Sequence, residues 1–163
     1  MTEEKFVTFK ESQTGEPSKI DSDELYSIDL HYTDGIARIF RLYGVDYMFN
    51  KPKKADKKTW FGSVYDGSII WLTQVNNGDI RINNAGTGYF IHDPGTSEAY
   101  FFWTKFAGSV KAFGEKKMFK ILIERHFATR CPKMVEENKS GTFKTTDIEE
   151  VIAYYKSNCD TKK

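Results

Sequence analysis

The chain has 163 residues, 15% of them aromatic, and its basic and acidic side chains nearly cancel to a formal net charge of +1. This length can bury the core of one domain without metals or disulfides, and the even charge argues against a surface covered all round by a polyanion. No apolar run is long enough for a membrane-spanning helix and the first residues lack a signal peptide's apolar core, so we expect a cytoplasmic protein.

Residues 1–24 are rich in acidic side chains and are predicted to form a flexible arm. Within it, Gln13 to Ser18 has the composition of a loop, and one short strand is expected over residues 5–10. The folded core is therefore predicted to begin at residue 25.

Two strands are predicted directly after the arm. Residues 25–32 alternate between apolar and polar side chains, as a half-buried strand does. Residues 36–43 fit a second strand, because Asp34-Gly35 favours a hairpin turn between two apolar runs; they also fit a helix that ends at Gly44. We prefer the hairpin, followed by a further strand over residues 45–49.

The next segment, residues 51–58, is dominated by lysine. It has no hydrophobic periodicity and contains Pro52, so it is predicted to be an exposed, mobile loop. It leads directly to the aromatic pair Trp60-Phe61.

Residues 60–106 predict an antiparallel meander, because short apolar runs alternate with turn signals. Residues 68–75 are apolar on both faces, which places this strand centrally in the sheet with Trp71 buried. Asn77-Gly78 and Pro94-Gly95 supply the backbone angles of the two tight turns.

Two helices are expected at the C-terminal end. Residues 115–128 carry apolar side chains at helical spacing, and Pro132 is expected to end that helix. Residues 136–141 are predicted to be a loop. A capping box that starts at Thr146 then opens the second helix.

Together these elements predict an α+β fold in one domain. Its sheet is an antiparallel twisted sheet or a small, partly open β-barrel of about six or seven strands, with two C-terminal helices packed on it. The sheet is assigned to residues 25–106 and the helical part to residues 107–163.

The sequence contains no distinctive catalytic, cofactor or metal motif. Its histidines and cysteines lack the close spacing of a zinc site, and the loop from Asn83 to Gly88 connects two predicted strands, whereas a dinucleotide-binding loop leads into a helix. We therefore expect a non-catalytic protein without a cofactor. Cys131 and Cys159 are expected to be reduced thiols, with a disulfide between them as the open alternative.

The functional prediction depends on an uneven distribution of charge. Basic side chains gather in residues 51–58 and in residues 111–133, whereas the N-terminal arm is acidic. Lysines beside aromatic rings are typical of nucleic-acid surfaces, where ammonium groups contact phosphates and rings stack on bases. We therefore predict a nucleic-acid-binding accessory protein for DNA or RNA. Its predicted contact residues are Lys51, Lys53, Lys54, Lys57, Lys58, Trp60, Phe61, Lys116, Lys117 and Lys120.

The alternative is a protein-interaction module, such as an inhibitor or immunity-type protein. In that interpretation an aromatic face of the sheet around Trp71 or Trp103 binds a protein partner. An enzyme with a dispersed site ranks third.

Overall fold

The computed structural model describes residues 5–10, 14–48, 51–76, 86–106 and 114–162. The described strands are β1 (Phe6–Phe9), β2 (Ser18–Asp21), β3 (Ser27–Tyr32), β4 (Gly35–Met48), β5 (Lys51–Asp66), β6 (Ile70–Asn76), β7 (Gly86–His92) and β8 (Glu98–Phe106). A 3-10 turn, η1 (Ser22–Glu24), precedes β3. The described helices are α1 (Glu115–Phe127), α2 (Pro132–Ser140) and α3 (Ile148–Asn158).

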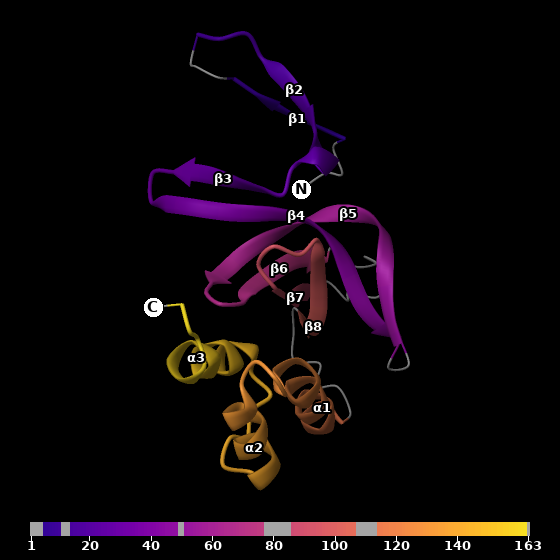
Figure 1. Cartoon of the computed structure of the whole chain (residues 1–163), viewed down its shortest axis with the longest axis vertical. Coiled ribbons are helices and arrows are strands. Elements are labelled where there is room, and N and C mark those ends of the chain that lie inside the picture. Colours follow the sequence, from indigo (N-terminus) through magenta and orange to yellow (C-terminus); the bar gives the residue numbers. More distant parts are fainter. Residues whose placement is uncertain (1–4, 11–13, 49–50, 77–85, 107–113, 163) are drawn as a thin grey trace.

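Strands β3 to β8 form one sheet in chain order, and every neighbouring pair is antiparallel. In addition, β4 pairs in parallel with β8, with Tyr43 opposite Glu98 and Val45 opposite Tyr100. This pairing closes β4 to β8 into a five-stranded barrel and leaves β3 outside it (Figure 1). The predicted α+β barrel is confirmed, and its sheet is mixed where a wholly antiparallel one was expected.

Strand β6 separates two hydrophobic cores, because its alternate side chains point to opposite faces. Ile70 and Leu72 face the barrel interior, where the other buried residues are Phe40, Leu42, Phe61 and Ala99. Trp71, and Ile69 just before the strand, face the helices, which cover this side of the barrel (Figure 1). Trp71 is fully buried, so the central position predicted for this strand is confirmed.

The N-terminal part contains a hairpin where one strand was expected. Phe6 to Phe9 pair with Ser18 to Asp21 in antiparallel register, and the Ser22 amide donates to the Lys5 carbonyl at 2.8 Å. The hairpin forms a sheet of its own beside β3 (Figure 1).

The hairpin preferred for residues 36–43 is confirmed, since this segment lies in β4 and pairs with β3. Residues 36–48 form one continuous strand, and the register between β4 and β5 shifts between Tyr43 and Val45. The Pro94-Gly95 turn is also confirmed: Gly95 has a φ of 84°, and the Thr96 amide donates to the Asp93 carbonyl at 3.1 Å. The Asn77-Gly78 turn and the strand expected at 79–83 lie outside the described residues.

The loop predicted for residues 51–58 is wrong. These residues begin β5 and pair with β4, with Asp46 opposite Lys53 and Val45 opposite Lys54. Backbone pairing requires no apolar side chain, and this end of β5 is exposed on both faces, so no alternation marked it as a strand. The predicted exposure is confirmed for Lys51, Lys53, Lys54 and Lys57, whereas Lys58 is half-buried.

The helical part contains one more helix than expected. α1 follows the prediction, but Pro132 begins α2, since the first helical position needs no backbone N–H. Gly141, with a φ of 84°, ends α2. The N-cap of α3 is Asp147, where Thr146 was expected: the Asp147 carboxylate accepts a hydrogen bond from the Glu149 amide at 2.9 Å.

Cys131 and Cys159 form a disulfide, with their Cα atoms 5.5 Å apart. The expectation of reduced thiols is therefore wrong. The bond joins the residue that caps the start of α2 to the residue that follows α3, and Cys131 is buried in the core beneath the helices.

Candidate functional site

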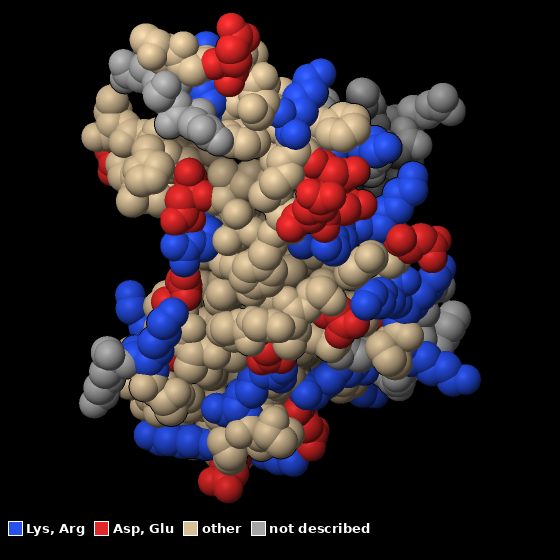
Figure 2. All heavy atoms as spheres, turned by 45° about the horizontal axis from the view of Figure 1, so that its top comes forward, with Lys and Arg blue, Asp and Glu red and all other residues tan. Residues whose placement is uncertain are grey.

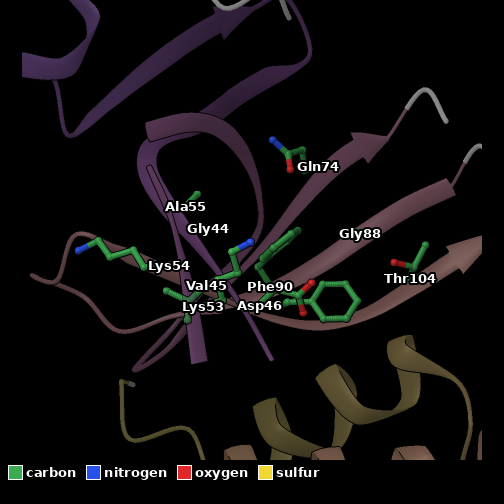
Figure 3. Close-up of a pocket in the computed structure, with 11 residues that line it drawn as sticks. Gly44, Val45, Asp46, Lys53, Lys54, Ala55, Gln74, Gly88, Phe90 and Thr104 are labelled. Carbon is green, nitrogen blue, oxygen red and sulfur yellow. The ribbon is translucent and has the colours of Figure 1, made fainter. Parts of the chain in front are cut away.

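A hollow of about 460 Å³ lies at one end of the barrel, between β4 and β5 on one side and β6 to β8 on the other. Figure 3 shows Phe90 between Lys54 at one side of this hollow and Thr104 at the other. We call it the barrel hollow. Its lining residues are Gly44, Val45, Asp46, Lys53, Lys54, Ala55, Gln74, Gly88, Phe90, Phe101 and Thr104.

Two phenyl rings form the apolar wall of the barrel hollow. The Phe90 ring centre lies 5.5 Å from that of Phe101 and 4.8 Å from that of Phe61, both in edge-to-face geometry. Phe90 therefore rests on the interior core, and both lining rings are half-buried. The two rings therefore present apolar surface to the hollow.

Glycine keeps the hollow open beside these rings. A Cβ atom on Gly88 would lie 3.0 Å from Phe90 Cε2 and 3.6 Å from the Gln74 carbonyl oxygen. A larger residue at this position would therefore displace the Phe90 ring. Across the hollow, Gly44 also contributes no side chain.

Lysines of β5 form the cationic rim. Lys54 Nζ lies 2.8 Å from Glu98 Oε1 and 4.3 Å from the centre of the Tyr43 ring. Hydrogen bonds from Lys54 and Tyr100 hold the pKa of the Glu98 carboxyl below its ordinary value. Lys54 is thus held in place at the rim, and the exposed Lys53 adds a second ammonium group.

Gln74 supplies a positioned polar group. Its Nε2 atom donates to Thr59 Oγ1 at 3.0 Å, which fixes the orientation of the amide within the hollow. Thr104 adds a hydroxyl at the far side (Figure 3). The hollow therefore offers cationic, aromatic and neutral hydrogen-bonding groups to one ligand, together with one carboxylate, that of Asp46.

The predicted lysines of β5 lie as follows. Lys51, Lys53, Lys54 and Lys57 are exposed, whereas Lys58 is half-buried. Lys58 Nζ donates to the Asp23 carbonyl at 2.7 Å. Lys53 and Lys54 are the members of this group that line the hollow.

The predicted stacking pair Trp60-Phe61 does not lie at a free surface. Phe61 is 1% exposed and belongs to the barrel interior. Trp60 is 9% exposed, and the Arg41 guanidinium lies 5.4 Å from its ring centre. Phe90 and Phe101 line the same hollow as Lys53 and Lys54, and sequence reasoning missed them because barrel closure, which brings β8 beside β4, creates this hollow.

The predicted lysines of α1 belong to another region. Lys116, Lys117 and Lys120 are exposed on α1, and Lys116 and Lys120 line a separate hollow among the helices. Figure 2 shows basic and acidic side chains interspersed over the face it displays. Among the described residues drawn on this face, the basic groups are broken up by acidic ones and do not form a continuous basic surface.

Of the two tryptophans proposed to bind a protein partner, Trp71 lies in the core and Trp103 is half-buried against α1. Trp71 is fully buried, and the Trp103 ring centre lies 4.6 Å from that of Phe119 in α1. Exposed apolar side chains lie instead at the turn between β3 and β4, where Tyr32 is 60% and Ile36 63% exposed.

Among the described residues, no group of three or more histidine, cysteine or acidic side chains could hold a metal ion. No helix in this part of the chain is long and apolar enough to cross a membrane. Comparisons with protein-family models, with curated proteins and with solved structures each found no match to this chain. We therefore infer a function from the geometry of the site.

Proposed function

We propose that the barrel hollow binds single-stranded nucleic acid as a non-catalytic accessory function. One base packs against Phe90 and Phe101, and the backbone phosphates beside it contact Lys53 and Lys54. The observation that supports this proposal is the convergence of two aromatic rings and two lysines on one hollow.

The volume of the hollow and the energy of base stacking are both compatible with this ligand. Stacking of a base on an aromatic side chain contributes about 1–3 kcal/mol, and ligand pockets commonly have volumes of about 300–1,000 Å³. The exposed Lys51 and Lys57 lie further along β5 and extend the cationic rim to neighbouring phosphates. Because the net charge is only +1, we expect few phosphate contacts and a modest affinity.

A salt series tests the proposal directly. Fluorescence anisotropy with labelled oligo(dT) and oligo(U) should show an affinity that falls with salt, with a log–log slope of about 0.7 per phosphate contact. The double variant Lys53→Gln/Lys54→Gln should flatten the slope by about 1.4, for two lost contacts. Lys133→Gln/Lys156→Gln removes the same charge from α2 and α3 and should leave the slope unchanged.

The aromatic wall has its own test. Phe101→Ala should weaken binding by about 1–3 kcal/mol at every salt concentration, because stacking involves no counterion release. If the wild-type protein binds neither oligonucleotide at low ionic strength, the proposed function is wrong.

A second candidate function is the capture of an extended peptide from a protein partner by β3. This strand is the edge of its sheet, and the exposed Tyr32 and Ile36 flank its turn. An exposed edge can accept another strand, with apolar side chains setting specificity. Peptides selected against the wild-type protein should lose binding to Tyr32→Glu/Ile36→Glu and retain it for Val64→Glu, a control residue that is 52% exposed. Equal binding to both variants would reject this edge.

A cytoplasmic location is also a proposal. It agrees with a nucleic-acid ligand, but the Cys131–Cys159 disulfide is a feature more common in oxidising compartments. Alkylation of free thiols in freshly lysed cells, followed by mass measurement, tests it: a fully oxidised pool would contradict a reducing location.

A further inference from the structure

A second hollow of about 460 Å³ lies among the helices, and we call it the helical hollow. It is bounded by α1, by the C-terminal end of α2 and by the connection from α2 to α3. Its lining residues are Lys116, Lys120, Asn138, Lys139, Ser140, Gly141, Lys144, Thr145 and Thr146.

The charge of this lining is one-sided. Its described residues include four lysines and no carboxylate. Lys139 is accounted for by its place in the last turn of α2, where a cation is favoured, and by its ion pair with Glu124 at 2.6 Å. Lys116 and Lys120 come from α1, and Lys144 comes from the connection between α2 and α3, yet all three line the same hollow. Their presence there is therefore not explained by the preference for a cation at the C-terminal end of α2.

The segment that carries Lys144 is fixed by its own contacts. The Gly141 and Phe143 amides both donate to the Glu137 carbonyl at 3.0 Å, and the Phe143 ring packs 4.6 Å from that of Tyr154. A Cβ atom on Gly141 would lie 2.7 Å from Lys144 Cε, so the lysine stem lies against this turn. The turn therefore brings the Lys144 side chain, which is exposed, to the edge of the hollow.

Hydroxyl and amide groups complete the lining. The Thr145 hydroxyl accepts a hydrogen bond from the Asp147 amide at 2.8 Å, and Ser140 Oγ donates to the Glu137 carbonyl at 3.0 Å. No aromatic ring is found among the described lining residues. These two hydroxyl protons are already donated within the chain, Ser140 to Glu137 and Thr145 to the Asp147 carbonyl, so the lysines are what suit the lining to a compact anion. The lining offers nothing for a base to stack on.

We propose that the helical hollow is a binding site for a small polyphosphate, an anion with two or more linked phosphate groups. Several ammonium groups around one hollow repel one another until an anion of matching charge neutralises them, and lysine is a common phosphate ligand. The site does not depend on the nucleic-acid function proposed for the barrel hollow, because the two share no residue.

Inorganic tripolyphosphate is the probe that tests this site. Calorimetric titration at constant ionic strength should show saturable binding that is tighter than that of sulfate. Lys120→Gln and Lys144→Gln should each weaken tripolyphosphate binding about tenfold, the effect of one lost charged hydrogen bond. Lys117→Gln is the matched control, because it removes the same charge from α1 without touching the lining, and it should change affinity less than about twofold.

The results separate this site from general electrostatics and from the barrel hollow. Wild-type binding of tripolyphosphate no tighter than of sulfate would overturn the proposal, as would an equal effect of Lys117→Gln and Lys120→Gln. Lys53→Gln/Lys54→Gln should leave tripolyphosphate binding unchanged, and Lys120→Gln/Lys144→Gln should leave oligonucleotide binding unchanged. If each double variant weakened both ligands, the two hollows would belong to one diffuse surface and the inference would be wrong. Circular dichroism of each variant verifies that the fold is intact.

Discussion

Gly67 controls how the C-terminus is attached to the barrel. The Asp160 carboxylate, just beyond α3, accepts hydrogen bonds from the Tyr65 hydroxyl and from the Ser68 amide, the latter at 2.9 Å. Burial would raise the pKa of Asp160, but these hydrogen bonds outweigh it and hold the pKa below its ordinary value. A Cβ atom on Gly67 would lie 2.3 Å from Asp160 Oδ2, so any larger residue would expel this carboxylate.

We therefore expect Gly67→Ala to lower the free energy of unfolding by about 1–3 kcal/mol, the range for displaced hydrogen bonds to a charged group. Urea denaturation measures it. Gly62→Ala is the control, because its Cβ would meet Thr73 Oγ1 at an ordinary 3.6 Å. In an Asp160→Ala background the same Gly67 change should cost less free energy of unfolding. An equal cost would show that the Tyr65 ring, whose Cε1 would lie 2.7 Å from the new Cβ, and not the carboxylate, is responsible.

His126 makes stability depend on pH. It is 3% exposed on α1, and burial, with repulsion from Arg130 and Arg125, lowers the pKa of its imidazole from 6.5 to about 4. Between these values the unfolded chain binds a proton that the folded protein does not. The contribution of His126 is therefore complete above pH 6.5 and is lost as the pH falls towards 4.

The expected loss is about 3 kcal/mol across this window. His126→Gln should reduce the slope of unfolding free energy against pH between 7 and 4.5, measured by urea denaturation. Some slope should persist, because burial also lowers the pKa of His92. His31→Gln changes an exposed histidine and should leave the slope intact. An unaltered slope in His126→Gln would contradict the assignment.

At the level of elements, the spacing of apolar residues along the sequence predicted those strands and helices whose buried side chains recur at a regular spacing. β6 and α1 place apolar side chains in the cores, and in β3 the half-buried Ile28 and Leu30 alternate with the exposed Asp29 and His31. All three elements were predicted. The start of β5 was missed because it is exposed on both faces, so only its partner β4 identifies it as a strand. α2 was missed because Pro132 was interpreted as the end of one helix when it is the beginning of the next.

The disulfide is the covalent link within the helical part. Cys131 and Cys159 are 28 residues apart in sequence, so the bond restricts the unfolded chain by about 3.5 kcal/mol in the loop-entropy description. We expect Cys131→Ala/Cys159→Ala to lose about 2–4 kcal/mol of unfolding free energy. A reductant should lower the free energy of unfolding of the wild-type protein by a similar amount and leave that of the variant unchanged. A wild-type protein that is insensitive to reductant, with both thiols open to alkylation, would show that the bond does not form.

At the scale of the whole molecule, closure of the barrel is the feature that could not be predicted from short-range sequence patterns. The parallel pairing of β4 with β8 joins segments about fifty residues apart, and no turn or periodicity signals such a contact. For this reason the sequence identified Lys53 and Lys54 of the barrel hollow but not Phe90 and Phe101. The helical hollow follows the same rule: its α1 lysines were predicted, whereas Lys144 depends on the path of the chain after α2.

The two cores share strand β6, so they should unfold together. Trp71 packs in the core beneath the helices and Leu72, the next residue, packs in the barrel interior. Trp71→Ala should cost about 3–5 kcal/mol and Leu72→Ala about 2–5 kcal/mol. If one core is lost, β6 is no longer held in place and the other core loses the side chains that this strand contributes. Each variant should therefore still unfold in one transition, so that the unfolding curves followed by circular dichroism at 222 nm and by tryptophan fluorescence coincide. If Trp71→Ala released the helical signal at a lower urea concentration than the fluorescence of the barrel, the helices would be a separate folding unit, and the barrel would be stable without them.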